Sequence, residues 1–287
     1  MLGMLNELYH SIDPVLFSIG PLSVRWYGLA YVAGFICAGL IVYFYAKHWK
    51  LRFSSYDTLV FVCYCAFGII IGARLGYCLF YGDGYYLAHP LEIFAVSNGG
   101  MSFHGGLVGI VIAGLIYSRV YDVPFLTLAD LVSCAVPVAD MAVIGAPLGL
   151  FFGRCANFVN GELYGAPTDL PIGVDFTGTG VMYHPSQLYE ALLEGLVIFF
   201  VLFVLSRKTD PPRPRGFFLG TFLVLYGVFR ILIEFVRLPD VQLGYFFGTW
   251  GTMGQLLSLP MLVVGICLLA WSLMRKDPQR GMPANRV

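Results

Sequence analysis

Five arginines lie away from the basic loops that contain the other twelve Lys and Arg residues, and each falls in the opposite half of an apolar run or in a loop on that opposite side: Arg25, Arg74, Arg154, Arg230 and Arg237. A charge in such a run is costly, and it usually marks a functional interior. No lysine occurs in the same kind of position. The planar guanidinium of arginine binds phosphate through two parallel hydrogen bonds while it stays charged. The set therefore predicts an anion site. For Arg25, Arg74 and Arg237, a structural ion pair or a side chain that reaches toward lipid head groups is an equal alternative.

Three carboxylates accompany these arginines. Arg230, Glu234 and Arg237 have the spacing of one helix face, because residues three, four and seven apart are neighbours on a helix. Glu190 and Glu194 are one turn apart, and we expect them to be counter-ions that hold the arginines in place. The charges of the site are therefore predicted to come in pairs of opposite sign.

A histidine and an amide lie in glycine-rich stretches. His104 has glycines after it, and both a proton-handling role and a structural role are open for it. Arg154 and Asn157 have helical spacing, while Gly161 and Gly165 are predicted to interrupt the helix and let backbone N–H groups approach a ligand.

The composition shows which elements must position these groups. Of the 287 residues, 58% are hydrophobic and 12% are charged, whereas soluble domains carry about 25% charged residues. This excludes soluble, disordered, collagen-like and disulfide-scaffold classes. The formal net charge is zero, so no basic field indicates a nucleic-acid partner. We expect an all-α, polytopic integral membrane protein.

A helix that crosses the hydrocarbon layer needs about 20 mostly apolar residues. Seven stretches qualify, and they are about 24–46, 57–81, 104–121, 127–152, 187–206, 217–237 and 253–274. We therefore predict one membrane domain over 1–287, in which 153–186 is an outer-face segment that carries part of the site. The start of the chain lacks the basic region of a cleavable signal peptide, and an ordered flank with a short amphipathic segment around Val15–Ile19 is expected.

The basic residues predict the orientation of the spans. Twelve of the 17 Lys and Arg residues follow the first, third, fifth and seventh spans, which places them on one side. Basic loops face the cytoplasm, so the N-terminus is predicted outside and the C-terminus inside. The polar groups described above then gather near the outer leaflet.

Other features are predicted to serve the scaffold. Gly68, Gly72 and Gly76 form a stripe of small residues for close helix packing. Asp130 ends a capping box that begins at Thr127. Asp140 lies in the middle of a span, and no role for it follows from the sequence.

Two kinds of chemistry are not expected. Cys155 is adjacent to Arg154, yet a small buried apolar residue is a better interpretation than a nucleophile. Ligand-spaced His, Cys and Asp clusters are absent from the sequence, so we expect no metal and no cofactor.

Several irregular motifs in this order resemble the prolipoprotein diacylglyceryl transferase family, and the likeness covers nearly the whole chain. They are Trp26-Tyr27-Gly28, the run Gly99–Gly106 around His104, Gly153–Gly165 with Arg154, Asn157, Asn160 and Glu162, His184–Glu190, and Arg230–Asp240. The segment between the fourth and fifth spans is short here, so contacts made by longer insertions in other members are not expected. Asp140 lies outside the pattern.

The resemblance implies a reaction and a location. Members of the family act in the bacterial inner membrane, where they transfer the diacylglyceryl group of phosphatidylglycerol to a cysteine thiol. That cysteine lies in the lipobox of a prolipoprotein signal peptide, and glycerol phosphate is released. The resemblance associates function with Tyr27, His104, Arg154, Asn157, Glu162, Gly165, Arg230 and Glu234.

We expect catalytic roles for His104, Arg154, Arg230 and Glu234 within this set. The two arginines would hold the phosphate, and His104 or a carboxylate would take the thiol proton. Substrate binding is expected from Arg154 and Arg230 together with Tyr27, Asn157, Glu162 and Gly165.

Two other functions compete with a lipid-modifying enzyme at this point. A secondary transporter of an organic anion would use the same arginines, although transporters tend to have two related halves and no repeat is evident here. A non-catalytic phospholipid-binding scaffold also fits the arginines but gives His104 and Asn157 no task.

Overall fold

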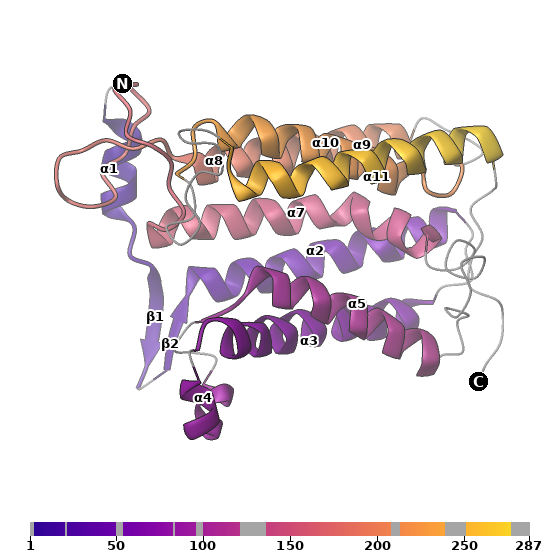
Figure 1. Cartoon of the computed structure of the whole chain (residues 1–287), viewed down its shortest axis with the longest axis horizontal. Helices are drawn as coiled ribbons and strands as arrows, with labels where there is room; N and C mark the ends of the chain where they lie inside the picture. Colours follow the sequence, from indigo (N-terminus) through magenta and orange to yellow (C-terminus); the bar gives the residue numbers. More distant parts are fainter. Residues whose placement is uncertain are drawn as a thin grey trace. The chain divides into compact units, whose positions relative to one another are not determined.

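The computed structural model describes residues 3–20, 22–49, 54–82, 84–95, 100–120, 136–207, 213–238 and 251–276. Long helices dominate this part of the chain (Figure 1). In chain order the elements are α1 (Met4–Ser11), β1 (Val15–Ile19), β2 (Leu22–Arg25), α2 (Trp26–His48), α3 (Ser55–Phe80), α4 (Tyr85–Ala88), a 3-10 helix (Pro90–Phe94), α5 (Phe103–Val120), α7 (Val136–Asn160), α8 (Ser186–Glu190), a π-helical segment (Ala191–Val197), α9 (Ile198–Arg207), α10 (Phe217–Glu234) and α11 (Met253–Arg275).

Among the described residues, six helical stretches are long and apolar enough to cross a membrane, which confirms a polytopic membrane protein. They are Trp26–His48, Ser55–Phe80, Ala139–Asn160, Ser186–Arg207, Phe217–Glu234 and Met253–Arg275. The predicted span 104–121 coincides with α5, whose described apolar part is the shorter Val108–Tyr117, so a seventh crossing stays a prediction.

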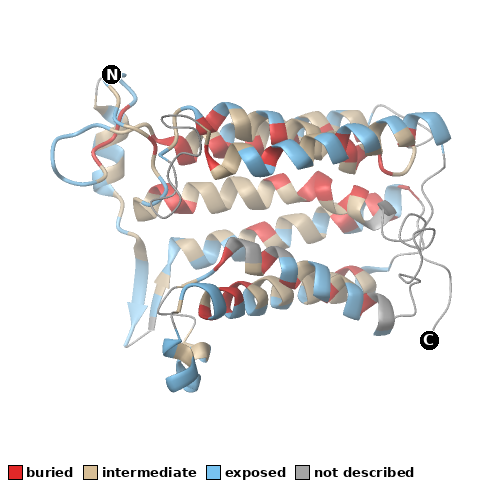
Figure 2. Cartoon of the chain, in the orientation of Figure 1, coloured by how far each residue is buried: buried red, intermediate tan, exposed pale blue. Residues whose placement is uncertain are grey.

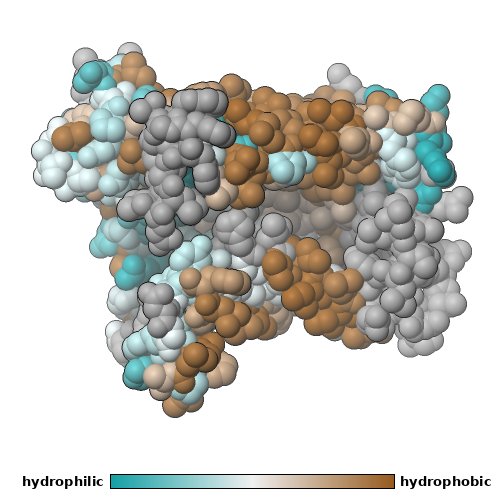
Figure 3. Space-filling view, in the orientation of Figure 1, coloured by the Kyte–Doolittle hydropathy of each residue, from teal (hydrophilic) through white to brown (hydrophobic). Residues whose placement is uncertain are grey.

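The protein itself buries little of these helices. Between 17% and 39% of each spanning window is buried, and large apolar side chains remain on the helix surfaces (Figure 3). Apolar surface of this extent is unfavourable in water. Lipid is therefore the solvent that the helices require.

Contacts divide the chain into two compact units. The first contains Met1–Val42 and Pro137–Gln279, and the second contains Tyr43–Val136 and Arg280–Val287. Glycines bring helices together inside the first unit: a Cβ added to Gly34 of α2 would lie 3.0 Å from Gly149 Cα of α7, and one added to Gly220 of α10 would lie 2.9 Å from the backbone nitrogen of Leu269 in α11. The buried residues of this unit lie along the helices that face one another (Figure 2).

The second unit confirms the predicted small-residue stripe. A Cβ added to Gly68 would lie 2.6 Å from Ala113 Cβ, and one added to Gly76 would lie 2.7 Å from Gly105 Cα. The backbones of α3 and α5 can therefore pack together only because the stripe lacks side chains. Asp130 and its predicted capping box lie outside the described residues.

Arg74 has a structural role in the second unit. Its side chain is buried and donates hydrogen bonds to three backbone carbonyls, those of Glu92 at 2.6 Å, Ile93 at 2.9 Å and Gly100 at 3.2 Å. It ties α3 to the segments that follow it. The structural alternative for this arginine is therefore the one that the fold supports.

Asp140 acquires a role that the sequence did not predict. Its carboxylate is fully buried and accepts hydrogen bonds from the backbone N–H groups of Gly216 at 2.6 Å and Leu219 at 2.7 Å. These groups belong to the first turn of α10, where N–H groups have no partner within the helix. A residue of α7 thus caps the start of α10.

The N-terminal flank is more regular than predicted. Val15–Ile19, expected as a short amphipathic segment, is strand β1 of an antiparallel hairpin in which Phe17 pairs with Val24. Arg25 ends the second strand and is exposed. Alternating side chains in 15–25 were the available signal for a hairpin.

Candidate active site

The end of α7 delivers the first site residues. The helix continues to Asn160, so 153–160, which follows the predicted span 127–152, is helical. Gly161 then adopts a φ of 68°, a conformation that suits glycine and ends the helix as predicted. Arg154 and Asn157 therefore lie one turn apart on a helix.

Glu190 joins three arginines from two helices and a following turn. Its carboxylate lies 2.6 Å from Arg154 Nε, 3.2 Å from Arg230 Nη1 and 3.6 Å from Arg237 Nη1. The glutamate is completely buried. The expectation that it is a counter-ion for the arginines is confirmed in geometry.

Glu234 is the second carboxylate of the cluster. Its Oε1 lies 2.7 Å from Arg230 Nη2, the pair predicted from their spacing, and 3.8 Å from Arg237 Nη1. Its Oε2 accepts a hydrogen bond from Thr252 Oγ1 at 2.6 Å. Both carboxylate oxygens therefore have partners.

Two residues at the start of α11 escaped the sequence analysis. Thr252 caps this helix together with Gln255 and also bonds Glu234. A Cβ added to Gly254 would lie 2.5 Å from the carboxyl carbon of Glu234, so only glycine fits there. The Thr-x-x-Gln capping box was the sequence signal for this helix start, but it does not reveal the bond to Glu234.

A π-helical segment, Ala191–Val197, follows Glu190 and carries Glu194. Such segments occur often at functional sites, because the extra residue re-aims the side chains. Gly195 allows close packing here, since a Cβ on it would lie 2.7 Å from Phe151 Cβ in α7. Glu194 is completely buried, and its one ion pair in the described part of the chain is with Arg230 Nη1 at 3.8 Å.

Glu162 organises the segment after α7. It accepts hydrogen bonds from Asn157 Nδ2 at 2.7 Å and from Asn160 Nδ2 at 3.3 Å. Its backbone carbonyl accepts another from Gln187 Nε2 at 2.7 Å, which connects this segment to α8. The structure therefore joins Glu162 to Asn157.

Gly165 brings the same segment against the end of α10. Its N–H bonds His184 O at 2.8 Å, and it forms an isolated bridge with Arg237. A Cβ on Gly165 would lie 2.8 Å from His184 Cβ, which explains why the position needs glycine. Burial lowers the pKa of His184, whose Nδ1 lies 3.1 Å from Tyr189 Oη.

Two residues predicted to belong to the site, Tyr27 and His104, have no hydrogen bond or ion pair to the arginines or glutamates above among the described contacts. Tyr27 begins α2, its hydroxyl lies 3.1 Å from that of Tyr31, and it is within electrostatic reach of Glu162 and Arg154. His104 begins α5 in the other unit, and its side chain lies outside the described residues. Its role as a base stays a prediction.

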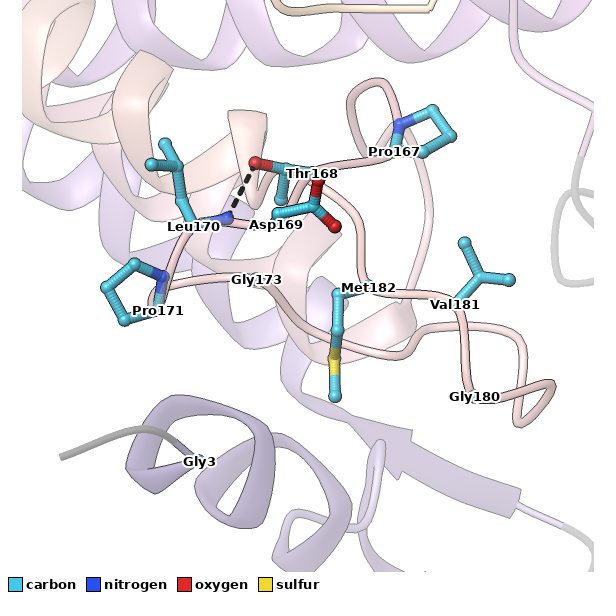
Figure 4. Close-up of a pocket in the computed structure, with 10 residues that line it drawn as sticks. All are labelled: Gly3, Pro167, Thr168, Asp169, Leu170, Pro171, Gly173, Gly180, Val181 and Met182. Atoms are coloured by element: carbon cyan, nitrogen blue, oxygen red, sulfur yellow. Dashed lines mark hydrogen bonds between the residues drawn. The ribbon is translucent and has the colours of Figure 1, made fainter.

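A cavity of about 460 Å³ lies apart from these charges (Figure 4). It is lined by Gly3, by residues of 167–173 and by residues of 180–182, with Leu170, Val181 and Met182 among its apolar side chains. Its lining residues include none of the six charged residues joined by ion pairs. The cavity and the charged cluster are therefore separate features.

The charged cluster consists of Arg154, Arg230, Arg237, Glu190, Glu194 and Glu234. Its two kinds of charge differ in access. The arginine side chains keep 10–17% of their surface exposed, whereas those of the carboxylates keep 0–4%. The arginines are therefore the more accessible members of the cluster, although Nη1 of Arg230 is buried.

Comparison with known proteins identifies the family. The family model for prolipoprotein diacylglyceryl transferase matches residues 14–271. The chain belongs to this family. The resemblance carried by the sequence motifs is thereby confirmed.

Relatives match along almost their full length. The chain is 48% identical to the phosphatidylglycerol–prolipoprotein diacylglyceryl transferase of Geobacter sulfurreducens, over 90% of this chain and 94% of that protein. It is 45% identical to the enzyme of the same name from Hydrogenovibrio crunogenus, with 92% and 96% covered. For that of Oleidesulfovibrio alaskensis the identity is 44%, with 96% and 98% covered.

Proposed function

We propose that this chain transfers the diacylglyceryl group of phosphatidylglycerol to the lipobox cysteine of a prolipoprotein, with release of glycerol phosphate. The observation that carries the proposal is the charged cluster itself, in which three partly exposed arginines are held by carboxylates that are almost completely buried. Family membership supports the same reaction, since the relatives named above are transferases for these two substrates.

Arg154 and Arg230 hold the phosphate of the donor lipid in this proposal. The phosphate gains negative charge as its bond to the glycerol carbon breaks, so donors held in place stabilise the transition state more than the ground state. One such donor contributes about 3–4 kcal/mol in enzymes where it has been removed. Glu190 and Glu234 keep the two guanidinium groups in position, which avoids reorganisation during the reaction.

The acceptor thiol must lose its proton. A free cysteine thiol has a pKa of about 8.5, and the thiolate is the nucleophile. The sulfur attacks the glycerol carbon that carries the phosphate, an S–C bond forms, and the C–O bond breaks with its electron pair going to the phosphate oxygen. His104 or a carboxylate takes the thiol proton. The transfer joins the two substrates directly and calls for no cofactor.

The remaining residues orient the lipid. Asn157 is held by Glu162, and Tyr27 lies within electrostatic reach of the same carboxylate. We assign both to the glycerol head group, and Gly165 to the close approach of the outer segment to Arg237.

The orientation forms part of the proposal: N-terminus outside, C-terminus in the cytoplasm, and the site toward the outer face of the bacterial inner membrane. The Lys and Arg distribution supports it. Reporter domains fused after Arg213 should stay cytoplasmic, and those placed near Asp175 should be exported. An exported reporter at Arg213 would refute this arrangement.

Purified protein in phosphatidylglycerol vesicles tests the reaction. Addition of a lipobox peptide should release glycerol phosphate, and a peptide with Ser in place of the lipobox Cys should release none. A transporter would instead move an anion without the peptide, and a scaffold would bind lipid without release. Either result would refute the proposal.

A further inference from the structure

The charge count of the cluster presents a problem for anion binding. Arg154, Arg230 and Arg237 supply three positive charges, and Glu190, Glu194 and Glu234 supply three negative charges if all are ionised. The sum is then zero, and an incoming phosphodiester would compete with carboxylates that already occupy the arginines. One positive charge in excess would match the charge of a phosphate monoanion.

The three glutamates are not equivalent. Glu190 contacts three arginines, with a shortest distance of 2.6 Å. Glu234 pairs with Arg230 at 2.7 Å and accepts a bond from Thr252 at 2.6 Å. Glu194 has one distant pair, 3.8 Å from Arg230. The oxygens of both Glu190 and Glu194 lack a hydrogen-bond partner among the described residues, so the close ion pairs of Glu190 are what distinguish the two.

Burial makes this difference decisive. The side chain of Glu194 is 0% exposed, and an ionised carboxylate without hydrogen bonds is strongly destabilised away from water. The neutral acid lacks that penalty. Glu190 and Glu234 differ from Glu194 in having arginine nitrogens at 2.6 Å and 2.7 Å.

We propose that Glu194 is a specificity-determining residue that carries a proton, so that the cluster has a net charge of +1 and accepts one phosphodiester monoanion. The inference rests on the proposed function for the identity of that anion. The groups that face Glu194 are Glu190 on its own helix, Arg154 of α7, Arg230 and Tyr226 of α10, and Arg237 after α10. Ionisation of Glu194 would return the cluster to neutrality.

Binding of phosphatidylglycerol, measured by calorimetry with the peptide absent, gives the first test. Above the midpoint of Glu194 ionisation, the Kd for the lipid should rise by about tenfold per pH unit. In Glu194→Gln, which is neutral at every pH, this slope should disappear. If the slope persists in the variant, another group such as Tyr226 carries it, and the proposal is overturned.

Infrared spectroscopy tests the proton directly and requires no transferase activity. The wild-type protein should show a carboxylic-acid carbonyl band at neutral pH that is absent from Glu194→Gln. The matched control is Glu92→Gln, because Glu92 is an exposed glutamate that bonds Tyr85 in the other unit. That variant should keep the band.

The carboxylic-acid band of the wild-type protein provides a test even if the Glu194 variant does not fold. As the pH is raised, this band should disappear in parallel with the loss of lipid binding. A wild-type protein without the band would overturn the proposal. Failure of the transfer reaction with the band present would instead refute the proposed function and leave the proton on Glu194 established.

Discussion

Both units contain arginines that come from long apolar runs of the sequence, but the partners of these arginines differ. Arg74 is 5% exposed and donates hydrogen bonds to three backbone carbonyls. Arg154 and Arg230 pair with carboxylates and keep 17% and 13% of their side-chain surfaces exposed. Hydrogen bonds to backbone carbonyls give Arg74 a structural role, whereas the ion pairs of Arg154 and Arg230 leave part of each side chain accessible to a ligand.

The largest effect that this comparison predicts is at Arg154. Lysine keeps the charge but replaces the planar fork with a compact, strongly hydrated ammonium group. If Arg154 binds the phosphate through two hydrogen bonds, Arg154→Lys should lower turnover by about a hundredfold or more at saturating lipid. The measurement is glycerol phosphate release, with the membrane level of the protein unchanged.

A loss below about tenfold, which corresponds to roughly 1.4 kcal/mol, would indicate a purely electrostatic role. The phosphate clamp would then have to rely on Arg230.

Arg74→Ala should affect stability rather than catalysis. The change leaves the carbonyls of Glu92, Ile93 and Gly100 without their donor, and unsatisfied buried groups cost about 1–3 kcal/mol each. Thermal unfolding in detergent should therefore occur at a lower temperature. Turnover per folded molecule should fall far less than in Arg154→Lys. An equal fall in both variants would contradict the assignment of a structural role to Arg74 and a catalytic role to Arg154.

Thr252→Val should produce a smaller effect within the charged cluster. Valine has the shape of threonine but lacks the hydroxyl that donates to Glu234 and caps α11. A hydrogen bond to a charged group contributes about 1.5–3 kcal/mol to stability. Its loss should leave Glu234, and therefore Arg230, less well positioned, so turnover should fall by a part of that amount. Thr252→Ser is the control, because it keeps the hydroxyl and should restore most of the turnover.

The sequence predicted the charged cluster better than it predicted its supports. Spacing alone paired Arg230 with Glu234, because i, i+4 geometry is local to one helix. Asp140, which caps a helix 76 residues away from it, and Thr252, which bonds Glu234 across two helices, depend on tertiary contacts that periodicity does not encode. The π-helical turn at Ala191–Val197 was also invisible, since an apolar run has the same composition with or without it.

Asp175 extends the comparison to a carboxylate whose hydrogen-bond donors are backbone N–H groups. The effect on stability expected from changing it is the smallest of those considered. Its carboxylate accepts bonds from the N–H groups of Gly178 and Gly180, both at 2.8 Å, and of Thr177 at 3.1 Å. These bonds, that from Gly180 above all, lower the pKa of Asp175 in the folded protein. The stability they provide is present above the unfolded pKa of about 3.9 and is lost as the pH falls through the lower folded value.

Amide hydrogen exchange in 175–180 should therefore be slow at neutral pH and should accelerate below about pH 4, relative to the intrinsic rate at each pH. Asp175→Asn should remove this acid-dependent change. Asp169→Asn, an exposed aspartate in the same segment, should keep it. Because the bonds are local to the loop, phosphate binding by the arginines should not respond to Asp175. If lipid binding were lost in parallel, Asp175 would contribute to the site although its partners are backbone groups. That result would contradict the conclusion that charged side chains bonded to the backbone, such as Arg74, are structural.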